Sequence, residues 1–200
     1  LTSLALAKAL VKKEIFVDLF YEKKNTKIDT TRTIGISKSN IDFFNREITN
    51  IKKMLWPIKK IKIFTENSND KEILKFEDQK DNLFSILQNQ KIFNQLIIEL
   101  KKSKFLKFKK YIKYRKFDNF SYDLIINCDI RNEITKKYFS KKFEKKYNSI
   151  AFTTIIDHVK LLSNNEAIQI FTNDGPIAFL PISKEKTSIV YSARMKKNKT

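Results

Sequence analysis

The sequence predicts an α/β chain in two parts, a parallel-sheet domain over residues 1–139 and part of a mostly antiparallel β-sheet domain over residues 140–200. Two observations carry this prediction. The alanine-rich stretch Leu1–Val11 has the pattern of a helix and runs into the apolar run Val17–Phe20, which is the order of a βαβ unit. The C-terminal part instead holds short apolar runs separated by turn residues, which is typical of antiparallel strands.

Composition places the chain among globular proteins. Its 200 residues are 42% hydrophobic and 12% aromatic, enough for a sizeable core. The apolar runs are too short to span a bilayer. Lys8 interrupts the apolar start and no small-residue cleavage site follows it, which argues against a signal peptide. Because the first residue is Leu1 rather than Met, we expect a fragment of a longer chain.

Cysteine and histidine are too few for several kinds of chemistry. The single cysteine, Cys128, excludes an internal disulfide and fits a reducing compartment. It lies in an apolar run, so we expect a buried and inert thiol. The single histidine, His158, has no second histidine or cysteine with which to share a metal ion, and no metal site is predicted.

Charge is the feature most open to misinterpretation. The formal net charge is +19, and lysines occur in nearly every segment. The chain also has 17 phenylalanines and only 2 glycines, which indicates a general drift in residue usage. Lysines spread in this way predict a solvated basic surface rather than a specific nucleic-acid-binding site. The stretch Lys101–Lys116 is the best local case for nucleic acid, because aromatic residues alternate with lysines there. We favour an edge hairpin with its aromatic side chains packed inward.

The N-terminal elements resemble the second half of a dinucleotide-binding unit. Ser3 could cap the first turn of the helix. The strand after it ends at Tyr21–Glu22, and an acidic residue at this place is typical of such units. The expected first strand and its Gly-x-Gly-x-x-Gly loop are not in these residues; Ser3 would then take the place of the third glycine.

Further elements follow from periodicity and turn signals. The pattern predicts helices near Ile41–Ile48 and over Lys91–Leu100, and strands at Trp56–Phe64, Phe84–Gln90, Leu124–Cys128, Ile150–Asp157, Ala167–Thr172, Ile177–Ile182 and Thr187–Ala193.

The hairpin within Gln169–Ile182 is the most specific signal. Apolar residues run up to Asn-Asp-Gly and resume after it, so Gly175 is expected to supply the backbone freedom of a tight turn. Pro181 has no N–H, so the second strand must end, bulge or lie at an edge there. The sequence motif Phe-Thr-x-x-Gly-Pro-Ile-Ala-Phe-Leu-Pro-Ile closely resembles the substrate-domain hairpin of UbiH-type hydroxylases of ubiquinone biosynthesis, a family of FAD-dependent aromatic monooxygenases.

This resemblance implies the p-hydroxybenzoate hydroxylase fold: a Rossmann-like FAD-binding domain, here incomplete, with an inserted, mostly antiparallel β-sheet substrate domain. It covers nearly the whole chain, in order. By the resemblance, the cofactor-binding candidates are Ser3, Glu22, Arg32, Asn89, Gln90 and Asp129 and the substrate-region candidates are Gly175, Pro176, Phe179 and Pro181, while the catalytic residues stay unknown.

Two positions depart from the family pattern. Gln90 stands where the family usually has an arginine near the flavin, and Ile130 replaces a glycine that follows Asp129. A side chain at that glycine position would obstruct the close approach of a cofactor to the backbone.

The resemblance implies an enzyme that uses FAD, NAD(P)H and O₂ to hydroxylate the ring of a prenylated phenol. Its partners would be that substrate, a ubiquinone-biosynthesis complex and an anionic membrane surface, with no specific nucleic acid. The protein would be cytoplasmic, either free or peripheral to the inner membrane. Two alternatives stay open: a catalytically impaired homologue that serves as a scaffold in a biosynthetic complex, and a basic nucleic-acid-binding protein.

Overall fold

A computed structural model describes residues 1–21, 30–67, 71–78, 80–110, 122–130, 132–139, 143–145 and 147–195. The chain divides into two compact units. The first unit consists of Leu1–Lys27 and Leu96–Lys146, and the second consists of Ile28–Gln95 and Tyr147–Thr200. The units interleave along the sequence, so each is described by itself.

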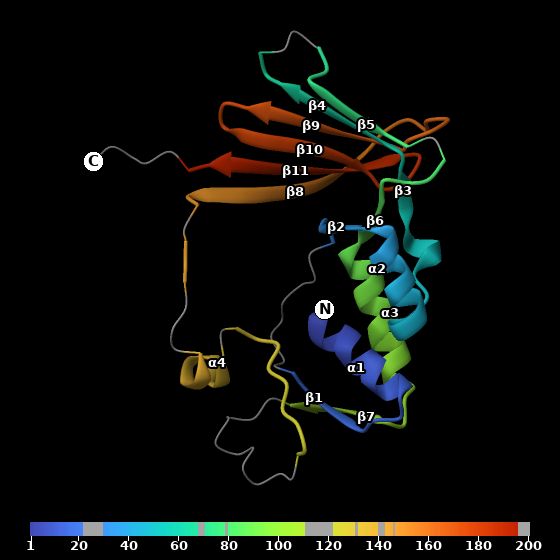
Figure 1. The fold of residues 1–200 in the computed structure, drawn as a ribbon, viewed down its shortest axis with the longest axis vertical. Helices are drawn as coiled ribbons and strands as arrows, with labels where there is room; N and C mark the ends of the chain where they lie inside the picture. Colours follow the sequence, from blue (N-terminus) through green and yellow to red (C-terminus); the bar gives the residue numbers. More distant parts are fainter. Residues whose placement is uncertain are drawn as a thin grey trace, which may run out of the picture. The chain divides into compact units, whose positions relative to one another are not determined.

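The first unit contains α1 (Thr2–Lys12), β1 (Val17–Tyr21), the C-terminal part of α3 (Asn89–Lys101), β7 (Leu106–Lys110) and α4 (Glu133–Tyr138). Strands β1 and β7 pair in parallel, with Val17 opposite Leu106 (Figure 1). The predicted helix and the strand that follows it are both confirmed.

Helix α1 buries one stripe of its surface. Leu4, Ala7 and Val11 are almost fully buried, a spacing that places all three on one face of the helix. The helix ends at Lys12, and Glu14, with a φ of 60°, reverses the chain two residues later. The N–H of Ile15 donates to the carbonyl oxygen of Leu10 at 3.2 Å. Ser3 does not cap the helix, because the helix starts at Thr2 with no side-chain cap.

Two sequence predictions in the first unit are wrong. Leu124–Cys128 is not a strand, and Cys128 is exposed rather than buried. The parallel neighbour of β1 is β7, which lies in the stretch predicted to be an edge hairpin. A parallel partner is joined through a long connection, so no short-range pattern reveals it.

The second unit contains β2 (Thr33–Ile36), α2 (Lys38–Phe43) with a π-helical turn after it (Phe44–Ile48), a 3₁₀ turn (Lys52–Met54), β3 (Trp56–Ile58), β4 (Lys60–Thr65), β5 (Leu74–Glu77), β6 (Phe84–Gln88), the start of α3, β8 (Ser149–Asp157), β9 (Glu166–Thr172), β10 (Gly175–Pro181) and β11 (Lys186–Arg194).

These strands form two sheets. The larger has the order β5-β4-β9-β10-β11-β8, and all neighbours are antiparallel except β4 and β9 (Figure 1). The smaller has the antiparallel order β2-β6-β3. The prediction that the four C-terminal strands share a sheet separate from β1 is confirmed.

The predicted single strand Trp56–Phe64 is two strands, β3 and β4, interrupted at Lys59 and placed in different sheets. The chain therefore passes from the smaller sheet to the larger one at this point. As a result, β4 and β5 belong to the same sheet as the C-terminal strands, although they precede residue 140.

One face of the larger sheet packs against the smaller one. Ile58 and Ile86 of the smaller sheet form a buried cluster with Ala167 of β9, and Ile61 and Leu180 pack against it. Within the described ranges, no helix is long and apolar enough to cross a membrane.

Candidate functional site

Two of the proposed cofactor contacts lie side by side where β2 begins and β6 ends. The N–H of Asn89 donates to the carbonyl oxygen of Arg32, with 3.0 Å between the atoms. The first ladder pair of β2 and β6, Thr33 opposite Gln88, comes directly after this bond. The sheet register therefore brings together two residues that are far apart in the sequence.

This corner is suited to an anion. Asn89 and Gln90 are the first two residues of α3, which is 13 residues long. The first N–H groups of a helix lack partners within the helix and carry partial positive charge. The side chain of Arg32 is exposed beside them and adds a full positive charge. The N–H of Asn89 is already bonded to Arg32. The guanidinium of Arg32, the amide side chains of Asn89 and Gln90 and the next N–H groups of the helix are donor types that can hold phosphate groups.

The other cofactor candidates belong to the first unit. Ser3 is half-buried inside α1. Asp129 is exposed, and its carbonyl oxygen accepts from the hydroxyl of Thr135 at 2.9 Å. Glu22 lies outside the described residues. The assignment of all six residues to a cofactor therefore stays a prediction.

The substrate-region candidates occupy β10, a central strand of the larger sheet. Gly175 has a φ of 134°, and a Cβ there would lie 1.9 Å from the carbonyl oxygen of Ser192, so both conformation and space require glycine. Pro181 is the last residue of β10, as its missing N–H predicts.

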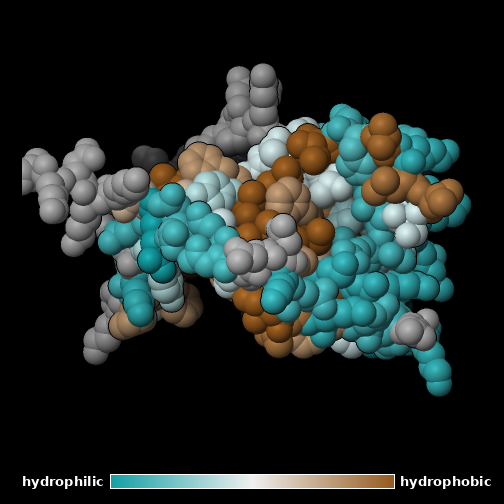
Figure 2. All heavy atoms as spheres, turned by 90° about the horizontal axis from the view of Figure 1, so that it is seen from above, coloured by the Kyte–Doolittle hydropathy of each residue, from teal (hydrophilic) through white to brown (hydrophobic). Residues whose placement is uncertain are grey.

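Alternation along β10 separates the candidates between two faces. Gly175, Phe179 and Pro181 point to one face, and Pro176 points to the other, which also carries Leu180 of the core. Phe179 lies between Ile168 of β9 and Ile189 of β11. Half-buried apolar residues thus line the face that points away from the core. Figure 2 shows hydrophobic side chains gathered into a patch bordered by hydrophilic ones on the side seen from above.

A polar cluster that sequence patterns did not indicate lies on β1 and β7. The carboxylate of Asp18 accepts from the hydroxyl of Tyr122 at 2.6 Å and from the ammonium of Lys109 at 2.7 Å. Burial opposes the charge on Asp18, but the hydrogen bonds from Lys109 and Tyr122 lower its pKa below the usual value of an aspartate overall. The one available signal was a charged residue inside an apolar strand.

Aromatic side chains in the described part of the basic stretch contact other aromatic rings of the chain. Phe105 meets Phe16 with ring centres 5.1 Å apart, and Phe108 meets Tyr21 at 6.4 Å. Phe105 and Phe108 are half-buried. The rings that they meet lie at the surface, since Phe16 is 78% exposed and Tyr21 43%. Tyr111 and Tyr114 lie outside the described residues.

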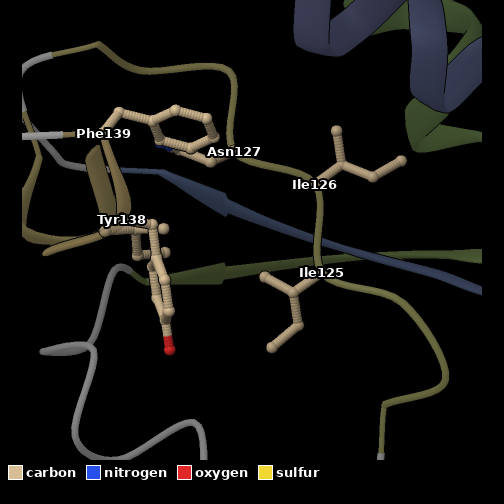
Figure 3. Close-up of a pocket in the computed structure, with 6 residues that line it drawn as sticks. Ile125, Ile126, Asn127, Tyr138 and Phe139 are labelled. Carbon is tan, nitrogen blue, oxygen red and sulfur yellow. The ribbon is translucent and has the colours of Figure 1, made fainter. Parts of the chain in front are cut away.

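An open apolar hollow of about 530 Å³ lies between the segment 125–127 and α4. It is lined by Ile125, Ile126, Asn127, Ile134, Tyr138 and Phe139. Figure 3 shows the rings of Tyr138 and Phe139 on one side and the two labelled isoleucines on the other. The amide of Asn127 is engaged by Thr135 at 2.7 Å and Asn132 at 2.6 Å, so the hollow offers mainly apolar contacts.

Comparison with known proteins places the fold. No protein-family model matches the sequence, and no curated protein matches it significantly. Among solved structures, PqsL, a probable FAD-dependent monooxygenase from Pseudomonas aeruginosa, matches with a TM-score of 0.69 and 9% identity over 96% of this chain and 57% of that chain.

Two further structures match similarly. HpxO from Klebsiella pneumoniae, complexed with FAD and uric acid, gives a TM-score of 0.72 and 11% identity over 98% of this chain and 54% of that chain. The p-nitrophenol 4-monooxygenase PnpA from Pseudomonas putida gives 0.68 and 12% over 98% and 56%. The chain thus has the mixed α/β fold of FAD-dependent monooxygenases, and it spans just over half the length of these structures.

Proposed function

We propose that the chain is part of an FAD-dependent aromatic monooxygenase, in which residues 1–139 contribute to FAD binding and residues 140–200 form part of the substrate domain. The fold match over 96% or more of the chain carries this proposal. The donor-rich corner at Arg32, Asn89 and Gln90 supports it, because an FAD-binding protein must hold a diphosphate.

The described residues fit such a cofactor at the level of donor chemistry. Arg32 and the N-terminus of α3 would hold an anionic phosphate group. When bound, FAD supplies the redox and oxygen-activating chemistry that side chains lack. This chain's residues would bind it, orient the substrate ring and exclude water.

For the substrate, we propose a prenylated phenol of ubiquinone biosynthesis, with NAD(P)H as reductant. The resemblance of the hairpin around Gly175 supports this choice, and so does the apolar sheet face that carries Phe179. A prenyl chain is apolar, as this sheet face is. The net charge of +19 would favour docking on an anionic membrane surface. We place the protein in the cytoplasm, close to such substrates and to their biosynthetic complex.

The test uses the complete product of the gene that encodes this chain. Its flavin absorption and FAD dissociation constant are compared with those of Arg32→Ala. We expect roughly tenfold or greater weakening, because a hydrogen bond to a charged group is lost. Lys53→Ala is the matched control, since Lys53 is an exposed cation of the same unit.

Turnover separates the enzyme from the alternatives. NAD(P)H oxidation should accelerate when a prenylated phenol is added. A protein that binds FAD without acceleration would favour the scaffold alternative. A protein that takes up no flavin yet binds RNA tightly at physiological salt would refute the proposal.

A further inference from the structure

Two pairs of hydroxyl groups join the start of β2 to the larger sheet. The hydroxyl oxygens of Thr31 and Thr153 lie 2.6 Å apart. Those of Thr33 and Ser188 lie 3.3 Å apart. Thr153 belongs to β8 and Ser188 to its neighbour β11, and Figure 1 shows β2 below both strands. Hydrogen bonds thus join the two sheets here, in addition to the apolar cluster around Ile58.

Arg32 lies between the two threonines and faces the other way. Its carbonyl oxygen accepts from the N–H of Asn89, which continues the ladder of β2 and β6 by one pair. Successive side chains of an extended strand point to opposite faces. Because Thr31 and Thr33 both reach the larger sheet, the guanidinium of Arg32 points away from that sheet. Exposure agrees, since Arg32 is exposed and both threonines are half-buried.

Threonine side chains can restrain a backbone in this way. The branched Cβ of threonine leaves few rotamers, so a hydroxyl that is held by a hydrogen bond also restrains the residue that carries it. Ser188 is fully buried and Thr153 is half-buried, and a buried hydroxyl group needs a hydrogen-bond partner. Turning the start of β2 about its own axis would separate both hydroxyl pairs at once. The two pairs therefore favour one orientation of Arg32.

We propose that Thr153 and Ser188 are positioning residues for Arg32. Through the threonines on either side of Arg32, they hold its guanidinium on the side of the α3 N-terminus. Their role rests on the proposed function, because FAD is the ligand proposed for this corner. A donor that is already oriented loses less conformational freedom when it binds, so the hydroxyl pairs should strengthen FAD binding. Strands β8 and β11 of the proposed substrate domain would thus contribute to cofactor affinity without touching the cofactor.

The experiment measures the FAD dissociation constant of the complete gene product that carries Thr153→Val, a change of similar shape that removes the hydroxyl. We expect FAD binding to weaken roughly threefold to fivefold, which is less than the effect of Arg32→Ala. Thr153→Ser keeps the hydroxyl and should retain most of the affinity. Thr154→Val is the matched control, because Thr154 is exposed on the opposite face of β8 and should leave the constant unchanged.

A double-mutant cycle distinguishes positioning from a general structural role. If Thr153 acts through Arg32, Thr153→Val should have little further effect on FAD affinity once Arg32 is replaced by alanine. Ser188→Ala should show the same dependence on Arg32. Equal weakening in the presence and in the absence of the guanidinium would overturn the inference, because the hydroxyl groups would then act on binding without Arg32.

Hydrogen exchange tests the backbone arrangement without the cofactor. The amide of Asn89 donates to the carbonyl oxygen of Arg32, so its exchange rate reports how firmly the start of β2 is held. Thr153→Val should raise this rate roughly threefold, while the amides of β10 keep their rates. An equal rise in both places would mean that the variant only lowers the stability of the unit, and it would overturn the inference.

The outcomes separate the positioning role from the proposed function. FAD binding that responds to Arg32→Ala but not to Thr153→Val would overturn the positioning role alone. FAD binding that does not respond to Arg32→Ala would also overturn it, while the proposed cofactor would stand. A complete gene product that takes up no flavin would overturn the proposed function and the positioning role together.

Discussion

β10 and the segment Tyr122–Ile130 are both rich in apolar residues, yet only β10 is a strand. β10 has an antiparallel neighbour on each side, and both neighbours are joined to it by short connections. The segment has no strand partner among the described residues and is held by side chains: Tyr122 bonds to Asp18, and Asn127 accepts from the N–H of Asp129 at 3.2 Å. An apolar run becomes a strand where neighbouring backbone is available to pair with it.

Local hydrogen bonds explain why the segment takes another conformation. An asparagine side chain that accepts from an N–H two residues later forms a turn that competes with a ladder. Asn127 makes this bond, and Asn132 then caps α4 by accepting from the N–H of Thr135 at 3.1 Å. Consequently Leu124 is 74% exposed, which is unlike a residue in a sheet core.

The largest expected effect comes from the backbone of the β9–β10 turn. Gly175→Ala must accept a φ of 134° and a Cβ that overlaps the carbonyl of Ser192. Strain costs about 1–3 kcal/mol and overpacking about as much again, so stability should fall by several kcal/mol. Denaturant unfolding measures this loss.

The chain provides a matched control for that variant. A Cβ at Gly35 would lie 3.5 Å from the ring of Phe84, an ordinary contact. Gly35→Ala should therefore change stability by less than about 1 kcal/mol. Similar losses from both variants would show that the turn at Gly175 is not specially constrained.

The same contrast between β10 and the segment Tyr122–Ile130 explains which parts of the fold the sequence could predict. The four C-terminal strands, the turn at Gly175 and the end of β10 at Pro181 were predictable, since short-range turn chemistry determines them. The partner of β1 was not, because parallel pairing with β7 joins distant residues. The contact between Arg32 and Asn89 likewise depends on the register of β2 with β6, and the sequence supplied the two residues only through a family resemblance.

An intermediate effect is expected at Asp18, which links β1 and β7 to the segment. Its folded-state pKa is lower than the usual value, so its contribution to stability is present above about pH 4 and is lost as pH falls through the folded pKa. Asp18→Asn should reduce the acid dependence of unfolding in that range. The pH profile of denaturant midpoints measures it.

Asp78→Asn is a suitable comparison for that profile because Asp78 is a carboxylate of the other unit whose side chain accepts from backbone N–H groups rather than from a cation. Asp78→Asn should leave unchanged the part of the pH dependence of the denaturant midpoint that is due to Asp18. If Asp18→Asn keeps the full acid dependence, the pair with Lys109 contributes little to folding.

The smallest effect is expected at Asn127, because its side chain stabilises only the segment Tyr122–Ile130 and the contact of that segment with α4. Its amide donates to Thr135 at 2.7 Å and accepts from Asn132 at 2.6 Å, and each such bond contributes roughly 0.5–1.5 kcal/mol. Asn127→Ala should raise hydrogen exchange at Thr135 and along α4 by about tenfold, while the amides of β10 keep their protection. Asn127→Asp keeps the acceptor and loses the donor, so the exchange rate of the α4 amides should lie between that of the wild-type chain and that of Asn127→Ala. Faster exchange in β10 would mean that the segment and the sheet open as one unit, and the contrast between them would fail.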